Sequence, residues 1–231
     1  MAKRLELPPA DLPNVVNALD RETSRFPFGK RLVDLVITIP ILVFLGPFML
    51  LVALAIRLTS PGPALFRQTR IGLGERPFTM LKFRTMANGA DDRVHQAFNR
   101  RELLGELDDS TPDGIYKPSN DSRITPLGSV LRRYSIDELP QLINVLKGEM
   151  SLVGPRPALP WEVALFTAEE RLRHRLPPGI TGLWQVSGRN LLSMKQMLAL
   201  DLHYCEQASL RLDLAILLRT PKAALLDRST R

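Results

Sequence analysis

The sequence has little cysteine and few aromatic residues. Cys205 is the only cysteine in 231 residues, which excludes an intramolecular disulfide and a zinc site built from several cysteines. Aromatic residues make up 6% of the chain, and no set of them suggests stacking on nucleic-acid bases. A cleavable signal peptide is not expected, because the first apolar run starts late and no small-residue cleavage site follows it. No internal repeat is visible.

Basic residues outnumber acidic ones. The 31 Lys and Arg against 24 Asp and Glu give a formal charge of +7 and an isoelectric point near 10.0. Such a balance favours an anionic partner, which can be nucleic acid, an acidic membrane surface or a phosphorylated substrate. The length suits one domain, or one domain with an anchor, and an apolar content of 45% is sufficient for a core.

One apolar run without a formal charge extends over residues 35–56, long enough to cross a bilayer. A straight transmembrane helix and a buried core helix are two possible interpretations. However, Gly46 and Pro47 interrupt the run, and Pro40 precedes them. Basic residues flank the run on both sides, so the positive-inside rule favours both ends on the cytoplasmic side. We therefore expect a re-entrant membrane helix over residues 30–58, with its break at Gly46 and Pro47. The flanking basic residues are Arg25, Lys30 and Arg31 before the run and Arg57, Arg67 and Arg70 after it.

The remaining pattern predicts an α+β fold that is mostly helical. A polar arm over residues 1–29, with one short helix near Val15, precedes the membrane helix, and a catalytic domain over 59–231 follows it. Short strands near 64–68 and 78–83 predict a β-hairpin. Helices are expected over 91–107, 127–134, from about 137 to 147, over 193–206 and over 210–218. The last suits either an interfacial amphipathic helix or a packed core helix.

Residues 168–176 predict a basic helix that is either solvated or in contact with anionic membrane lipid head groups. His174 within it is expected on the surface. The acidic pairs Asp91–Asp92 and Asp108–Asp109 are interpreted as solvated faces or helix ends rather than metal ligands.

The stretch Tyr134–Gln141 carries the chemistry. Its Ser135-x-x-Glu138 spacing fits a capping box, with Asp137 as an alternative N-cap, and this purely structural interpretation explains the spacing well. A second interpretation uses the same positions. A carboxylate at a helix start, close to Arg132, stays ionised and can attack phosphorus. A neighbouring carboxylate can hold Mg²⁺ (magnesium) against a diphosphate.

Several basic or polar residues are candidate ligands of the substrate phosphates. Arg156 lies between two prolines, where a rigid loop would aim its guanidinium at phosphate oxygens. The complete candidate set is Asp137 and Glu138 as catalytic and metal-binding residues, and Arg132, Arg156, Lys82, Arg84, Arg189 and Asn190 as substrate-binding residues. For Arg189 and Asn190 a loop cap is an equal alternative.

At this point the sequence resembles the bacterial sugar transferase family, the small monotopic polyprenyl-phosphate phosphoglycosyl transferases. The resemblance covers residues 30 to about 220, and its ordered motifs are specific as a set. They are Lys30-Arg31-x-x-Asp34, Pro47, Ser60-Pro61-Gly62-Pro63, Phe66-x-Gln68-x-Arg70-x-Gly72, Lys82-Phe83-Arg84-Thr85-Met86, Arg123-Ile124-Thr125, Arg132-Arg133-x-Ser135-x-Asp137-Glu138-Leu139-Pro140-Gln141, 144–157, 178–182 and 185–190.

The resemblance implies a re-entrant helix and a ping-pong reaction at the inner membrane of a bacterium, with the catalytic domain on the cytoplasmic face. Asp137 would attack the sugar-bearing phosphate of a UDP-sugar, UMP would leave, and undecaprenyl phosphate (a polyprenyl phosphate) would accept the phosphosugar. Glu138 would complete the dyad with Mg²⁺, and Arg132 and Arg156 would bind phosphate. Such a step starts exopolysaccharide, O-antigen, capsule or glycoprotein glycan assembly. The family often has Ser where this chain has Gly46, and Asp where it has Glu149.

Three other interpretations remain open. A nucleic-acid-binding protein would explain the charge but not the apolar run, so no nucleic-acid partner is expected. A basic, non-enzymatic membrane scaffold would reduce Asp137 and Glu138 to helix caps. A bitopic form of the same enzyme would place residues 1–30 in the periplasm. A homo-oligomer is possible, and the sequence does not identify the sugar.

Overall fold

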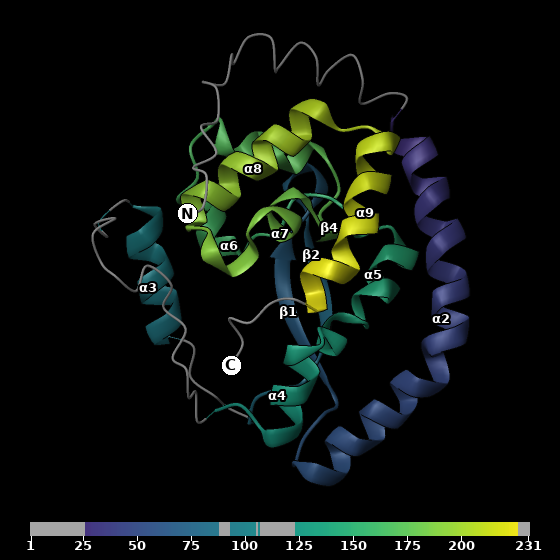
Figure 1. The fold of residues 1–231 in the computed structure, drawn as a ribbon. Coiled ribbons are helices and arrows are strands. Elements are labelled where there is room, and N and C mark those ends of the chain that lie inside the picture. The colour runs from purple at the N-terminus through teal and green to yellow at the C-terminus, as the bar shows by residue number, and fades with distance from the viewer. Residues whose placement is uncertain (1–25, 88–92, 105, 107–122, 226–231) are drawn as a thin grey trace.

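A computed structural model describes residues 26–87, 93–104, 106 and 123–225. The expected helix near Val15 and the two acidic pairs lie outside these residues. The described part is mostly helical with two small sheets, which confirms the α+β class (Figure 1).

The apolar run forms one long helix. Helix α2 covers Phe26–Thr59, 34 residues, and is therefore about 51 Å long. It continues through Gly46 and Pro47, so the expected helix-break-helix is corrected to a single helix, which bends along its length in Figure 1. A proline removes one hydrogen bond and displaces the preceding turn, and a bend absorbs this while the flanking hydrogen bonds persist.

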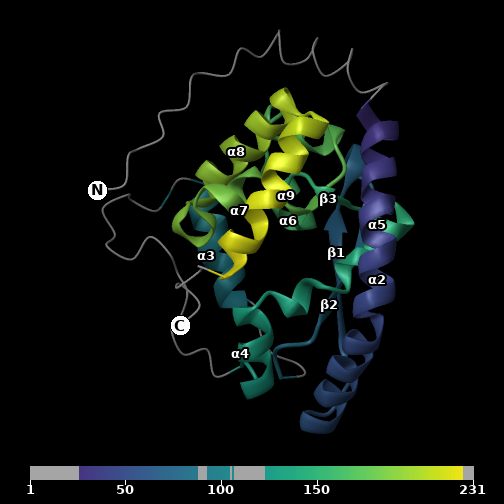
Figure 2. The same cartoon turned by 45° about the vertical axis from the view of Figure 1, so that its right-hand side comes forward.

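Both halves of α2 pack on the same globular domain. Ile37 and Ile41 in the first half pack against a buried cluster that includes Val145 and Tyr204. In the second half, Val52 and Ile56 belong to a second cluster with Phe83 and Leu131. Figure 2 shows the helix lying along one side of the domain.

The polar start of α2 is also tied to that domain. The three defined side chains of the Lys30-Arg31-x-x-Asp34 motif each contact a different element. Lys30 Nζ lies 2.7 Å from Asp213 of α9 (Leu210–Leu225). Arg31 donates to the carbonyls of Val145 and Leu146 at the end of α5 (Gln141–Lys147), at 2.5 and 2.7 Å. Asp34 accepts from Ser151 and Leu152 of β3 (Ser151–Val153), at 3.0 and 2.9 Å.

The expected hairpin is confirmed. Strands β1 (Leu65–Ile71) and β2 (Pro77–Phe83) pair antiparallel, with Phe66 opposite Lys82. A short 3₁₀ turn, η1 (Leu73–Glu75), joins them. A second, parallel pair consists of β3 (Ser151–Val153) and β4 (Gly179–Thr181). A Cβ added at Gly179 would lie 2.1 Å from the Gly154 nitrogen, so only glycine allows this approach.

The other helices follow local sequence signals. Thr125 caps α4 by accepting from the Gly128 N–H at 2.9 Å, and Ser193 caps α8 through Gln196. These two helices confirm the predictions over 127–134 and 193–206. The remaining bounds are α3 Arg93–Leu103, α4 Pro126–Arg133, η2 Ile136–Glu138, α5 Gln141–Lys147, α6 Pro160–Val163, η3 Glu170–Arg175, α7 Leu183–Ser187, η4 Arg189–Leu191, α8 Met194–Gln207 and α9 Leu210–Leu225.

The basic segment near residue 174 differs from expectation. It forms the 3₁₀ helix η3, and its Arg173 and His174 are buried at 3% and 5% exposure, so the predicted surface position of His174 is wrong. The reason is tertiary, because α8 supplies the carboxylate of Asp201 as the ion-pair partner of Arg173. Burial, followed by the nearby Arg173 charge, lowers the pKa of His174 to about 4.

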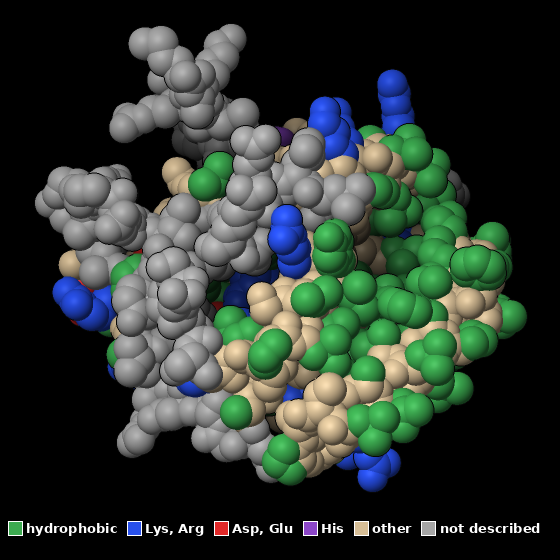
Figure 3. Space-filling model, turned by 60° about the horizontal axis from the view of Figure 1, so that its bottom comes forward, with side chains coloured by type: hydrophobic (Ala, Val, Ile, Leu, Met, Phe, Trp, Pro, Cys, Tyr) green, Lys and Arg blue, Asp and Glu red, His purple; other side chains and the backbone are tan. Residues whose placement is uncertain are grey.

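An apolar face covers the outside of α2. Figure 3 shows hydrophobic side chains gathered over this side of the molecule. By length and composition Gly29–Thr59 is the one helix in the described part of the chain that could cross a membrane. Helix α9 adds Leu214 and Leu218, exposed at 50% and 82%, while its Asp213 and Ile216 are buried. Helix α9 therefore packs on the core through one face and exposes leucines on another.

Candidate active site

The two adjacent carboxylates lie in a tight turn between two helices. Ser135, two residues beyond the end of α4, adopts a left-handed conformation with φ of 54°, and η2 then carries Asp137 and Glu138. The predicted capping box is wrong, because Ser135 makes no side-chain cap hydrogen bond and α5 begins later, after Pro140. The turn instead leaves both carboxylates half-buried, beside strand β2.

Strand β2 supplies the closest cation. The Lys82 ammonium lies 2.7 Å from Glu138 Oε1, and 26% and 33% of the two side chains are exposed. Although burial opposes ionisation, Lys82 holds the pKa of Glu138 below its ordinary value. Glu138 is therefore ionised at neutral pH.

Asp137 has the opposite shift. Burial, followed by the charge of Glu138, raises its pKa to about 6, although Lys82 and Arg132 oppose the rise. Two neighbouring carboxylates with pKa values pushed apart are a common feature of catalytic sites. At neutral pH Asp137 is mostly ionised and lies next to a second negative charge.

Four arginines from separate elements lie with Lys82 around the two carboxylates, and we call these five side chains the cationic surround. The four arginines are Arg70, Arg132, Arg156 and Arg189. Arg132 of α4 donates from Nε to Thr85 Oγ1 at 2.8 Å and acts electrostatically on Asp137. Arg70 and Arg189 act electrostatically on Glu138, and Glu138 acts on Arg156. The structure thus brings together four of the predicted basic residues: Lys82, Arg132, Arg156 and Arg189.

A buried carboxylate holds Arg156 in place. Its Nη1 donates to both Glu162 oxygens at 3.1 and 3.2 Å, and Glu162 is fully buried. Because of this ion pair, the pKa of Arg156 rises above its ordinary value. The backbone N–H of Arg156 also donates to Asp201, the partner of Arg173. Glu162 was not singled out in the sequence, since only the tertiary structure pairs it with Arg156.

Arg189 spans two elements. Its φ of 49° is left-handed, and its guanidinium donates to Ser135 Oγ at 2.9 Å and to the Ala223 carbonyl of α9 at 3.3 Å. The site therefore contains two left-handed residues, Ser135 and Arg189, joined by a hydrogen bond. The side chain of the other candidate in this loop, Asn190, lies outside the described part.

Arg84 and Arg70 make contacts that the sequence did not predict. Arg84 is 7% exposed and donates from Nη2 to the carbonyl and hydroxyl oxygens of Ser60 (2.8 and 2.6 Å), so it fixes the chain after α2. Arg70 was not selected, yet it acts on both Glu138 and Glu162 and donates to the carbonyl of Pro157, next to Arg156. The signal that could have identified Arg70 was its place in the β1 motif.

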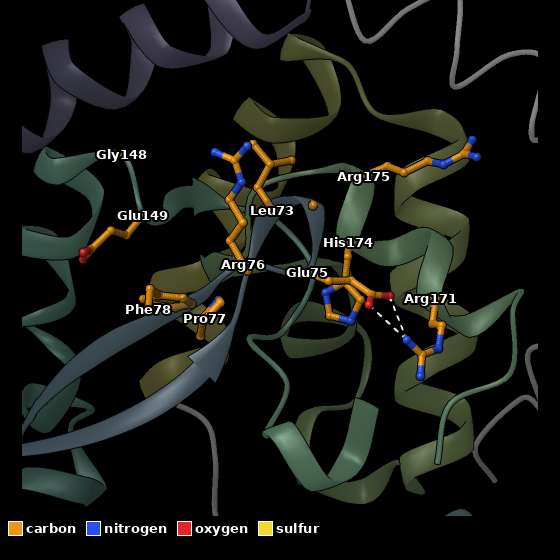
Figure 4. Close-up of a pocket in the computed structure, with 12 residues that line it drawn as sticks. Leu73, Glu75, Arg76, Pro77, Phe78, Gly148, Glu149, Arg171, His174 and Arg175 are labelled. Atoms are coloured by element: carbon orange, nitrogen blue, oxygen red, sulfur yellow. Dashed lines mark hydrogen bonds and ion pairs between the residues drawn. The ribbon is translucent and has the colours of Figure 1, made fainter. Parts of the chain in front are cut away.

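A separate pocket lies at the other end of the hairpin. It has a volume of about 840 Å³, and Figure 4 shows it between the β1–β2 turn, the end of α5 and η3. The Arg171–Glu75 ion pair, at 3.0 Å, borders it. None of the candidate catalytic or phosphate-binding residues lines this pocket.

Comparison with known proteins matches residues 25–227 to the model of the family described as bacterial sugar transferase. An exopolysaccharide production protein, ExoY, of Sinorhizobium fredii is 40% identical over 202 residues, 87% of this chain and 88% of the relative. A UDP-glucose:undecaprenyl-phosphate glucose-1-phosphate transferase of Caulobacter vibrioides is 43% identical over 199 residues, 83% of this chain and 67% of the relative.

A third relative is longer. The undecaprenyl-phosphate galactose phosphotransferase of Salmonella typhimurium is 37% identical over 217 residues, which is 91% of this chain but 43% of the relative. The family match spans nearly the whole chain and includes every candidate residue of the dyad and its cationic surround. This chain belongs to the bacterial sugar transferase family.

Proposed function

We propose that this protein transfers a phosphosugar from a UDP-sugar to undecaprenyl phosphate and releases UMP. This reaction is the first step in the assembly of a surface polysaccharide. Support comes from family membership and from relatives named for such transfers. The observation that carries the proposal is the Asp137–Glu138 pair, which five cationic side chains surround. A diphosphate donor has the opposite charge to this surround.

In the proposed reaction Asp137 is the nucleophile. Its carboxylate oxygen attacks the sugar-bearing phosphorus, the phosphorus–oxygen bond to UMP breaks, and an aspartyl-phosphosugar remains. An oxygen of undecaprenyl phosphate then attacks the same phosphorus, which frees the Asp137 carboxylate and yields the polyprenyl-diphosphate sugar. Each substrate in turn meets the same carboxylate, which gives ping-pong kinetics.

The cations stabilise charge on the transferring phosphoryl group. Arg132 and Arg156 are already held by Thr85 and Glu162, so little reorganisation is needed when phosphate binds. Lys82 keeps Glu138 ionised, and Arg189 holds the turn through Ser135. These residues bind and orient the phosphates.

The donor chemistry of the dyad fits Mg²⁺. Two carboxylates offer hard oxygen ligands, and a cation would relieve the repulsion that helps to raise the pKa of Asp137. No group of three acidic, histidine or cysteine side chains converges within the described ranges, so substrate phosphates and water would supply the other ligands. When bound, Mg²⁺ would neutralise charge on the diphosphate. Asp137 and Glu138 are the residues that would hold the ion, and Lys82 would remain in contact with Glu138.

The enzyme would be seated on the cytoplasmic face of the membrane, with α2 entering and leaving on one side. Both ends of α2 contact the same domain, through Lys30 at the start and Ile56 near the end. A helix that crossed the bilayer would separate these ends by about 30 Å of hydrocarbon. The exposed apolar face of α2 would then contact lipid, with α9 at the interface and basic side chains such as Arg57 near anionic head groups.

The proposal is tested by incubating the detergent-held protein with Mg²⁺ and single UDP-sugars, without acceptor. Intact mass should show a phosphosugar adduct that hydroxylamine removes, as expected of an acyl phosphate. Asp137→Asn should abolish the adduct, and Glu75→Gln, at an exposed surface carboxylate, should retain it. Transfer to undecaprenyl phosphate without any adduct would make Asp137 a base or metal ligand. Neither adduct nor transfer with any donor would favour the scaffold interpretation.

A further inference from the structure

Asn144 is a fully buried amide at the centre of the domain, and every polar atom of its side chain is engaged. Its Oδ1 accepts from the Leu81 N–H at 3.0 Å, and its Nδ2 donates to the Thr79 carbonyl at 2.7 Å and to Glu149 Oε2 at 2.6 Å. Buried amides with complete hydrogen bonding fix the elements they join, because any shift leaves a buried polar group unpaired.

The Asn144 amide makes hydrogen bonds to β2 that a neighbouring strand would otherwise make. Within the described chain β2 has a single strand neighbour, β1. Thr79 and Leu81 present their remaining carbonyl and N–H groups at the opposite edge, two residues apart. One residue of a parallel strand would accept from such an N–H and donate to such a carbonyl, and the Asn144 side chain makes both bonds. Helix α5 is thereby locked in register along β2.

This register determines where Lys82 lies relative to Glu138. Lys82 directly follows Leu81 on β2, and Glu138 precedes Asn144 by six residues, through the η2 turn and the start of α5. The contact between Lys82 and Glu138, at 2.7 Å, is therefore made between two elements that Asn144 holds together. A slide of α5 along β2 would separate these two charges.

We propose that Asn144 is a positioning residue for the transfer reaction, which acts by holding Lys82 of β2 against Glu138. The inference rests on the proposed function, since Lys82 and Glu138 acquire a catalytic role only there. Glu149 supports Asn144 in this role. The Glu149 carboxylate accepts the second hydrogen of the Asn144 amide and so orients the amide oxygen towards Leu81. A carboxylate at position 144 would instead face both the Thr79 carbonyl and Glu149.

The test is a double-mutant cycle in the full chain held in detergent with Mg²⁺. Asn144→Asp should lower kcat with the UDP-sugar that forms the adduct by tenfold or more, with a much smaller change in KM. In a Lys82→Gln background the same substitution should cost less than twofold, because the contact that Asn144 positions is already gone. A general structural defect would cost the same factor in both backgrounds, and that result would overturn the proposal.

A second variant covers the case in which Asn144→Asp does not fold. Glu149→Gln leaves both bonds to β2 in place and should lower kcat a few-fold, again only when Lys82 is present. Adding Glu149→Gln to Asn144→Asp should restore part of the activity, since a glutamine amide can donate to the new carboxylate. A Glu149→Gln effect that is equal in both Lys82 backgrounds would refute the mechanism. If wild-type protein transfers nothing from any UDP-sugar, the proposed function fails instead.

Discussion

The ammonium of Lys30 lies 2.7 Å from the carboxylate of Asp213, and only 3% and 5% of the two side chains are exposed. This pair joins the start of the apolar helix α2 to α9, across 183 residues of sequence. Asp213 also accepts from the Tyr204 hydroxyl at 2.6 Å. The apolar helix α2 is therefore held to the globular domain by a buried charge pair as well as by apolar packing.

Loss of this pair should destabilise the fold. Lys30→Met leaves the buried Asp213 carboxylate without its counter-charge, which typically costs about 3–5 kcal/mol. Urea unfolding in a fixed detergent, followed by Trp fluorescence, measures the difference. The control is Glu75→Gln, which breaks the exposed Arg171–Glu75 pair and should cost less than about 1 kcal/mol. Equal costs for the two variants would contradict the buried-pair account.

The topology of α2 can be measured by cysteine labelling. Cys205 is buried, and burial raises the pKa of its thiol, so the natural background should react little. Single cysteines at Ser24→Cys and Pro61→Cys flank α2, and Lys147→Cys in the catalytic domain serves as the cytoplasmic reference. An impermeant maleimide should label all three only after spheroplasts are permeabilised. Labelling of Ser24→Cys in intact spheroplasts would establish the bitopic alternative.

The kcat/KM of adduct formation should have an acid limb near pH 6, because this ratio reports ionisation in the enzyme before the donor and its Mg²⁺ bind. Burial and the adjacent Glu138 raise the pKa of Asp137 to about 6, and the ionised form is the nucleophile in the proposed reaction. The ratio should therefore halve near that pH and fall about tenfold for each further pH unit. Glu138→Gln removes one of the charges that raise this pKa, so the limb should move to lower pH. Rapid-quench measurement of the adduct tests both points, and a ratio that stays constant down to about pH 5 would show that ionisation of Asp137 is not required.

The turn before the dyad should respond differently to two small substitutions. Ser135→Ala and Ser135→Gly both remove the hydroxyl that Arg189 donates to, and a hydrogen bond to a charged group is worth about 1.5–3 kcal/mol. Both should therefore lower kcat by about tenfold or more. Glycine relieves the left-handed strain at φ of 54°. The free energy of unfolding of Ser135→Gly should therefore be about 1 kcal/mol higher than that of Ser135→Ala. Full activity in either variant would show that the Ser135–Arg189 contact is dispensable.

Local sequence signals predicted several elements correctly. The helices expected over 127–134 and 193–206 form as α4 and α8, and in the structure Thr125 and Ser193 cap them through bonds within one helical turn. The left-handed Gly148 at the end of α5 is of the same kind. Such features are readable because the interacting groups are three or four residues apart.

The capping box at Ser135 shows where local interpretation failed. The serine has a distant partner, Arg189, and a left-handed backbone, so its hydroxyl is unavailable to the helix. The prediction of a surface position for His174 failed for the same reason. Packing around the Arg173–Asp201 pair buries a segment whose composition indicates a solvated surface. In both cases a long-range contact outweighed the local preference.

The sequence by itself determined the apolar helix, the hairpin, the adjacent carboxylates and the family, because these depend on composition, periodicity and the order of motifs along the chain. Only the tertiary structure decided which cations reach the dyad. Lys82, Arg132, Arg156 and Arg189 surround it together with the unpredicted Arg70, whereas Arg84 turns to Ser60. Charges that are far apart in sequence meet only when the hairpin, α4, the loop after β3 and η4 pack together, and no local pattern specifies that convergence.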